Sequence, residues 1–74
     1  MWNNGVITDG EDVYIYFIKH FNEGSRFGIN EGKISKLEIK RNNTMVVLYD
    51  RGWIIRPITK VETAIYNMII ELYN

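Results

Sequence analysis

The chain has 74 residues, which suffices for one small domain over residues 1–74 but leaves little apolar surface to bury in its own core. It contains no cysteine, so disulfide bonds, thiolate metal sites and a cysteine nucleophile are excluded, and we expect a reducing cytoplasm. Nine lysine and arginine residues balance nine acidic residues, so bulk charge predicts no attraction to nucleic acid or to a membrane. No apolar run approaches the roughly 20 residues of a membrane span, and no cofactor fingerprint is present.

Two strand-like segments open the chain. Residues 3–8 predict a short strand, and the turn at Thr8–Glu11 contains Asp-Gly, which tolerates the positive φ angles of a hairpin. The next strand, from about Asp12 to Phe21, has apolar or aromatic side chains on both faces. We therefore expect both of its faces to be covered, only one of them by a helix.

A glycine-rich loop follows over residues 22–32. Its backbone N–H groups, with Arg26 and Lys33, fit an anion-binding loop as well as a plain crossover, although it matches neither a P-loop nor a dinucleotide motif. Residues 33–41 and 44–50 then predict a hairpin around Asn42-Asn43, with a bulge near Ile34, which falls out of phase.

The last third of the chain predicts a helix. Gly52 interrupts the preceding strand, and we interpret residues 53–55 as its bent extension. Thr59 and Glu62 fit a capping box at the start of a helix from about 60 to 73. One apolar stripe is expected to pack on the sheet, and a second is expected to contact another chain. The first stripe is Val61, Ala64, Ile65, Met68, Ile69 and Leu72, and the second is Tyr66, Ile70 and Tyr73.

These elements predict an α+β fold, in which a four-stranded antiparallel β-meander carries one C-terminal α-helix packed on it. The second helix stripe and the two-sided apolar strand exceed what one small core needs. We therefore expect the chain to pair with itself as a homo-oligomer, through that helix stripe or through the second face of the sheet.

Five side chains form the candidate ligand site, four of them within eight residues and one in the loop. Guanidinium groups bind phosphate or carboxylate with two parallel hydrogen bonds, and tyrosine and tryptophan rings stack on bases. In the alternative interpretation, the aromatic residues are buried in a core that needs large side chains. The predicted ligand-binding residues are Arg51, Trp53, Tyr49, Arg56 and Arg26.

No catalytic or metal-binding residues are predicted. His20 is the only histidine, and neither Ser25 nor Ser35 lies in a nucleophile elbow, so we expect a protein that is not an enzyme. A minor alternative is single-stranded nucleic acid bound to a basic sheet face, which the zero net charge disfavours. That face would consist of Lys33, Lys36, Lys40 and Arg41, with Tyr14 and Tyr16 as stacking partners.

One pattern covers about half of the chain. Phe27–Leu37 contains Gly-Ile-Asn, then glycine, a basic residue and Ile-Ser-Lys-Leu, and Tyr-Asp-Arg-Gly-Trp follows at Tyr49–Trp53, before Pro57. The pattern resembles a family of small uncharacterised proteins from bacteriophages and Firmicutes genomes. The resemblance implies a phage or mobile-element origin and, by analogy, an anti-defence protein in the cytoplasm of a bacterial host. We expect an oligomer that sequesters a small anionic, nucleotide-like ligand; the alternative is a protein–protein inhibitor of a host factor.

Overall fold

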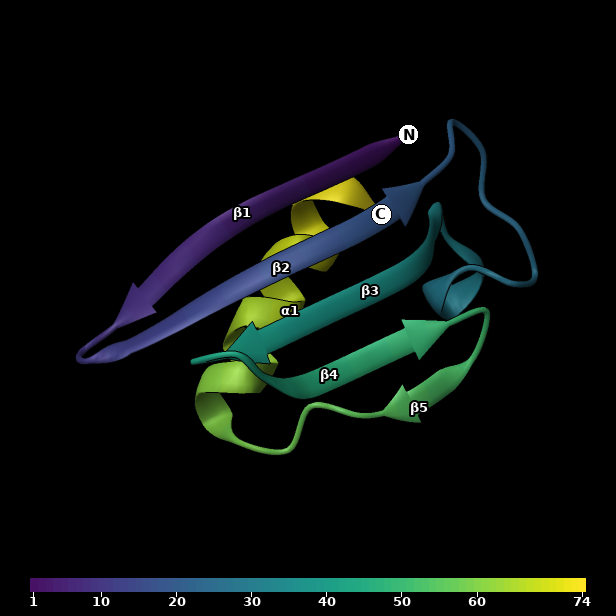
Figure 1. Cartoon of the computed structure of the whole chain (residues 1–74). Helices are drawn as coiled ribbons and strands as arrows, with labels where there is room; N and C mark the ends of the chain where they lie inside the picture. The colour runs from purple at the N-terminus through teal and green to yellow at the C-terminus, as the bar shows by residue number, and fades with distance from the viewer.

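A five-stranded antiparallel sheet with one helix across it forms the fold of this chain in a computed structural model that describes residues 1–74 (Figure 1). The strands pair in chain order. The α+β class, the antiparallel meander and the C-terminal helix are confirmed, whereas the sheet has five strands, not four. The elements are β1 (Trp2–Asp9), β2 (Asp12–His20), a 3-10 turn (Ile29–Glu31), β3 (Ile34–Arg41), β4 (Thr44–Asp50), β5 (Trp53–Ile55) and α1 (Lys60–Tyr73).

The fifth strand exists because the chain reverses direction after β4. Arg51 has a φ of 58°, in the left-handed region, and the chain returns so that Tyr49 pairs with Trp53. The prediction that residues 53–55 extend the preceding strand is therefore wrong. A left-handed residue turns the backbone back on itself, and no turn motif in the sequence announces that conformation at an arginine.

The other connections follow the local turn chemistry. Asn42 and Asn43 have φ angles of 48° and 72°, as a two-residue hairpin between β3 and β4 requires. The Val13 N–H donates to the side-chain oxygen of Asn42 at 2.9 Å, which ties this hairpin to β2. The pairing of β2 with β3 shifts register at the start of β3 and leaves Ser35 as the extra residue. The predicted bulge near Ile34 is confirmed.

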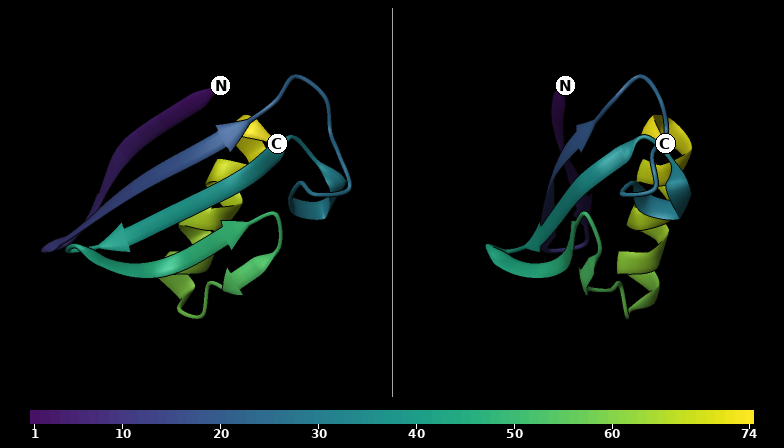
Figure 2. Two further views of the ribbon diagram at one scale, coloured as in Figure 1. Left: turned by 45° about the vertical axis from the view of Figure 1, so that its right-hand side comes forward. Right: turned by 90° about the vertical axis from the view of Figure 1, so that its right-hand side faces the viewer.

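The core lies between one face of the sheet and α1 (Figure 2). Side chains two positions apart on β2, β3 and β4 point to this face because successive residues of a strand alternate. The buried residues are Tyr14, Tyr16, Ile18, Ile29, Ile34, Leu37, Ile39, Val47, Tyr49, Ile65 and Ile69.

Helix α1 begins at the predicted capping box. The Thr59 hydroxyl accepts a hydrogen bond from the Glu62 N–H at 3.1 Å, and the Glu62 carboxylate accepts one from the Thr59 N–H at 3.3 Å. The same carboxylate also accepts from the Ile58 N–H at 2.9 Å, so Glu62 is satisfied although it is buried. The helix runs from Lys60 to Tyr73, as predicted.

The helix buries parts of both predicted stripes: Val61, Ile65 and Ile69 of the stripe assigned to the sheet pack in or against the core, as expected. Tyr66, Ile70 and Tyr73, which were assigned to a partner chain, pack against the core, while Met68 and Leu72 from the stripe assigned to the sheet are exposed. Two rings of the second stripe meet aromatic residues of the sheet: Tyr66 lies 5.5 Å from Trp53, centroid to centroid, and Tyr73 lies 6.2 Å from Tyr16. The Ala64 side chain also faces outward. The assignment of the second stripe to a partner chain is therefore wrong, and the sheet-facing stripe is confirmed only for Val61, Ile65 and Ile69.

The opposite face of the sheet has no helix over it (Figure 2). We call this the open face; its exposed apolar side chains include Trp2, Val6, Val13 and Phe17, with 40–64% of their surface accessible. The expectation that both faces of β2 are covered is not met within the chain. No helix in the structure combines the length and apolar character needed to cross a membrane.

Candidate ligand site

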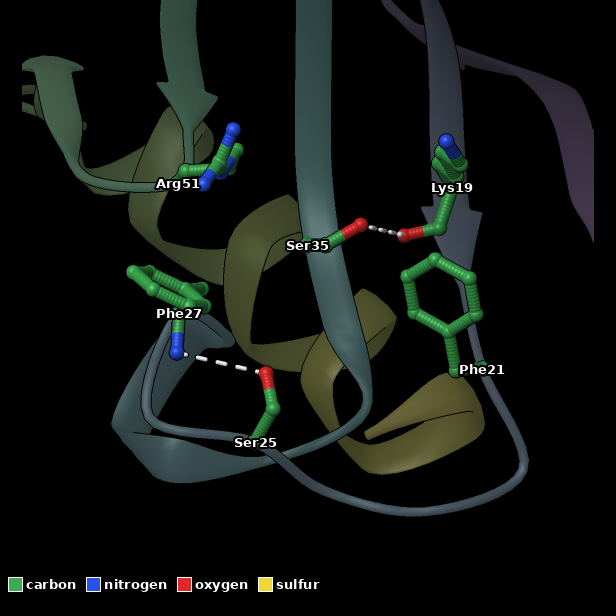
Figure 3. A pocket seen from close by; sticks show the side chains of 6 residues that line it. All are labelled: Lys19, Phe21, Ser25, Phe27, Ser35 and Arg51. Carbon is green, nitrogen blue, oxygen red and sulfur yellow. Dashed lines mark hydrogen bonds between the residues drawn. The ribbon is translucent and has the colours of Figure 1, made fainter.

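A cavity of about 290 Å³ lies at the end of the sheet, between the strand ends and the loop 21–33. Figure 3 shows Arg51 and Phe27 on one side of it, Lys19 and Phe21 on the other, and Ser35 between them. Ser25 completes the lining. Two cations, two aromatic rings and two hydroxyl groups thus surround one cavity, and none of the lining residues is acidic.

The bulge in β3 positions three of these residues relative to one another. Because Ser35 is the unpaired residue of the bulge, its hydroxyl reaches back and donates to the Lys19 carbonyl at 3.4 Å. The Ser35 carbonyl in turn accepts a hydrogen bond from the Arg51 N–H at 3.0 Å. The bulge therefore links the end of β2 to the turn after β4 and brings Lys19 and Arg51 to the same cavity.

Arg51 is held in an unfavourable backbone conformation. Its φ of 58° is rare for residues with a side chain and costs roughly 1 kcal/mol or more relative to right-handed backbone. The guanidinium lies over the Phe27 ring, 4.8 Å from its centroid, and Arg26 approaches the same ring at 5.1 Å. The Phe27 ring is thus contacted by two arginines.

The loop that closes the cavity is held by backbone hydrogen bonds. The Phe21 N–H donates to the Lys33 carbonyl at 3.0 Å, and the Ser25 N–H donates to the Gly32 carbonyl at 3.1 Å. From the core side, the Tyr49 hydroxyl donates to the Phe27 carbonyl at 2.7 Å. A loop with this many internal bonds presents its side chains in a preformed arrangement, which lowers the entropic cost of ligand binding.

Asn74, at the end of α1, fastens the 3-10 turn of the loop. Its amide nitrogen donates to the Ile29 carbonyl at 3.1 Å, and its amide oxygen accepts from the Ile34 N–H at 3.0 Å. The side chain lies so close to Gly32 that a Cβ there would overlap it. Gly32 is therefore required by the packing of Asn74 against the loop.

A sequence model of the family described as "Domain of unknown function (DUF7678)" matches residues 1–74. The chain belongs to this family. This agrees with the expected kinship to an uncharacterised family. A comparison with curated proteins finds no match, and a comparison with solved structures finds none either.

The five predicted ligand residues occupy different surroundings in this DUF7678 chain. Arg51 lines the cavity, and Arg26 is exposed beside it on the Phe27 ring. Tyr49 and Trp53 instead lie on the helix side, where their rings meet edge to face at 5.2 Å and Tyr49 is buried. Arg56 stacks on Trp53 at 5.1 Å. The structure thus brings Arg51 and Arg26 together and separates them from the other three.

Sequence reasoning missed Lys19 and Phe21 as site residues. Lys19 lies near the end of the apolar strand β2 and Phe21 directly follows it, so both look like ordinary strand-end side chains, and only the pairing of β2 with β3 brings them to the bulge. The loop was considered as an anion-binding segment, and two of its residues, Ser25 and Phe27, do line the cavity. The cluster of glycines around Phe27 was the sequence signal that could have identified the loop as part of the site, because glycines allow the close backbone packing that gives a loop a defined shape.

The remaining candidate residues lie apart from the cavity. Tyr14 and Tyr16 are buried beneath α1, so they do not flank the lysines of the basic sheet face as bases would require. The His20 ring packs against Tyr73 at 5.7 Å, and its Nε2 lies 3.2 Å from the Asn3 amide nitrogen. His20 thus belongs to the helix side of the sheet.

Proposed function

We propose that this chain is a non-enzymatic binding protein that holds a small anionic ligand with a flat ring, such as a nucleotide, in the cavity beside Lys19 and Arg51. The observation that carries the proposal is the lining itself: two cations and two aromatic rings around one cavity, with no acidic side chain among them. A volume of about 290 Å³ lies at the lower end of small-molecule sites, which typically measure about 300–1,000 Å³. The ligand is therefore small.

The two cations supply the anion-binding half of the proposal. A guanidinium offers a planar fork that matches phosphate or carboxylate oxygens, while the lysine ammonium acts as a compact point charge. The Ser25 hydroxyl accepts from the Phe27 N–H and so keeps its own O–H as a neutral donor at the cavity wall. The left-handed backbone of Arg51 supports the same assignment, because strained conformations at non-glycine residues concentrate at ligand sites.

The two phenylalanines supply the ring-binding half. Phe21 and Phe27 keep 47% and 41% of their surface exposed, although a core could have used them. Aromatic faces of this kind stack on bases, at about 1–3 kcal/mol per base. Each ring already has a cation beside it, since the Lys19 ammonium lies 5.4 Å from the centroid of Phe21.

Binding is favoured over catalysis by the hydrogen bonds of the two serines. The Ser35 hydroxyl donates to a backbone carbonyl, and the Ser25 hydroxyl accepts from the Phe27 N–H at 3.2 Å. Neither hydroxyl is bonded to a histidine or carboxylate that would activate it as a nucleophile. The anti-defence role implied by the family resemblance would use such a cavity to remove a nucleotide signal.

Isothermal titration with mononucleotides, cyclic nucleotides and ADP-ribose, and with inorganic phosphate as a ring-free probe, tests the proposal. Arg51→Gly removes the guanidinium, and glycine adopts the φ of 58° without strain. We expect the affinity for every bound probe to fall roughly 10- to 100-fold, because the ligand loses about one charge-assisted hydrogen bond. Phe27→Ala should weaken nucleotide binding and spare phosphate binding.

Arg56→Ala is the matched control, because it removes the same charge from an arginine that stacks on Trp53 and does not line the cavity. We expect its ligand affinity to equal that of the unaltered protein. Equal losses in Arg51→Gly and Arg56→Ala would show that only net charge matters. A failure of all probes to bind the unaltered protein would contradict the proposed function.

The open face favours a second candidate function, inhibition of a host protein. Trp2, Val6, Val13 and Phe17 expose apolar surface on neighbouring strands, as protein-binding surfaces do. For this function, Phe17→Ser would abolish a stoichiometric complex with a host enzyme while nucleotide affinity stays unchanged. A complex lost with Arg51→Gly and retained with Phe17→Ser would contradict this second assignment.

A further inference from the structure

Strand β1 forms one edge of the sheet, and no segment of the chain lies beyond it (Figures 1 and 2). It is eight residues long and pairs with β2 without a register shift from Trp2 to Asp9. The other edge is different, because β5 has only three residues and is followed by Arg56 and Pro57. The sheet therefore has one protected edge and one long, regular edge.

The hairpin geometry identifies the free backbone groups of β1. Its two-residue turn, Gly10 and Glu11, makes Asp9 and Asp12 the closing hydrogen-bonded pair, and bonded pairs then recur at every second residue. The bond from the His20 N–H to the Met1 carbonyl, at 2.9 Å, fits this phase. The outward-facing N–H and C=O groups therefore belong to Trp2, Asn4, Val6 and Thr8.

Nothing in β1 blocks the approach of another strand. Residues 2–8 contain no lysine, arginine, proline or acidic residue, and none of their positions is a bulge. These are the devices by which β-proteins normally prevent pairing at a sheet edge. Unpaired N–H and C=O groups in this regular array are complementary to one kind of occupant, an extended strand.

We propose that the occupant is a second copy of this chain, whose β1 pairs antiparallel with this β1 around a two-fold axis at Gly5. The four residues with free backbone groups are placed symmetrically about Gly5. In the dimer, Trp2 therefore pairs with Thr8 of the partner subunit, and Asn4 pairs with Val6 of the partner subunit. This register uses every free group of both strands and forms about eight backbone hydrogen bonds. The two five-stranded sheets become one continuous sheet.

Self-pairing fits better than pairing with an unrelated strand because the register is self-complementary. A two-fold interface requires one surface to be complementary to itself. Strand β1 meets this requirement, because Asp9 of each copy lies opposite Met1 of the other and no like charges oppose each other. The axis lies perpendicular to the sheet, so both helices fall on one side. Both open faces and both ends that carry the cavity then stay accessible. The partner also covers part of Val6, which is 64% exposed in one copy.

Sedimentation analysis of the full chain over a concentration series tests this pairing. The unaltered protein should be a dimer, and Val6→Pro should raise the dimer dissociation constant at least tenfold. Proline removes the outward N–H of Val6 and is tolerated on an edge strand whose N–H faces solvent. Val6→Thr is the matched control, because it keeps the N–H and the β-branched shape and should remain a dimer.

Amide hydrogen exchange of the unaltered protein gives a second readout that needs no variant. The N–H groups of Asn4, Val6 and Thr8 should exchange slowly where the dimer dominates and rapidly after dilution. A monomer throughout the series would overturn the proposal, and so would a dimer with fast exchange at these groups. A dimer that survives Val6→Pro but dissociates with Phe17→Ser or Leu72→Ser would place the interface on the open face or on α1 instead, which also overturns it.

Discussion

Arg51 combines three properties at one residue: a left-handed backbone, a hydrogen bond from its N–H to the β3 bulge, and a guanidinium stacked at the cavity. The sequence predicts Arg51 as a ligand-binding residue, because an arginine next to aromatic residues is a common recognition pattern. The sequence does not predict Lys19 as a site residue, because Lys19 lies 32 positions before Arg51 and is brought to the cavity only by strand pairing. Residue type predicts candidate chemistry, and tertiary pairing decides which candidates meet.

The Tyr16 and Tyr73 hydroxyls, whose oxygens lie 3.1 Å apart, predict a pH dependence of stability. This hydrogen bond, assisted by burial, raises the pKa of Tyr16 to about 12. A tyrosine in the unfolded chain ionises near pH ~10. Because the folded-state pKa is raised, the stabilisation is complete below pH ~10 and is lost as the pH rises towards 12.

Chemical denaturation at a series of pH values measures this effect. We expect the free energy of unfolding of the unaltered protein to fall more steeply than that of Tyr16→Phe between pH ~10 and ~12, because the variant has no hydroxyl to ionise at that position. The difference between the two proteins should therefore shrink with rising pH. Parallel curves would contradict a raised pKa at Tyr16.

At the scale of elements, the features that depend on neighbouring residues were predicted from the sequence. The Asn42-Asn43 hairpin, the bulge at the start of β3 and the capping box of α1 each follow from side chains within a few positions of one another. The fifth strand was missed because a left-handed arginine is unusual, so the turn after β4 has no common signature. The bulge was predicted, but its role in the site was not.

The two apolar stripes of α1 show why a helix face is harder to predict. They adjoin each other, and periodicity alone does not say which of them meets the sheet. The sheet decides, because Trp53 and Tyr49 form an aromatic cluster to which the Tyr66 ring adds, and Tyr73 meets Tyr16. The Tyr66 and Tyr73 rings therefore join Ile65 and Ile69 on the inward side, and Met68 and Leu72 are exposed.

Asn74 connects α1 to the loop and predicts a linked loss of stability and affinity. Asn74→Ala leaves the Ile29 carbonyl and the Ile34 N–H without their partner, which should lower the free energy of unfolding by ~1–3 kcal/mol. The loosened loop should also weaken the affinity for whichever nucleotide binds. Thermal unfolding and titration measure the two effects.

The matched control for Asn74 is Asn67→Ala, an exposed asparagine on the same helix, which should leave both quantities nearly unchanged. Full stability in Asn74→Ala would mean that the loop does not depend on this side chain.

At the scale of the whole molecule, a net charge of zero conceals an uneven distribution. The cavity is lined by two cations and no carboxylate, so a protein that is neutral overall has one end suited to an anion. The zero net charge makes a long nucleic acid only a minor alternative, which stays a prediction, and composition could not locate this end. The proposed dimer would place two such cavities at opposite ends of one continuous sheet, away from the two-fold axis.

NMR titration of the ¹⁵N-labelled protein with the nucleotide panel locates the bound ligand, which is the most direct test of the proposed cavity site. We predict that the backbone resonances of Lys19, Ser25, Ser35 and Arg51 shift most and saturate together, and that those of Lys19, Ser25 and Ser35 shift far less in Arg51→Gly at the same nucleotide concentration. Resonances that shift instead around Val13 and Phe17 on the open face, or around Trp53 and Arg56, would contradict it.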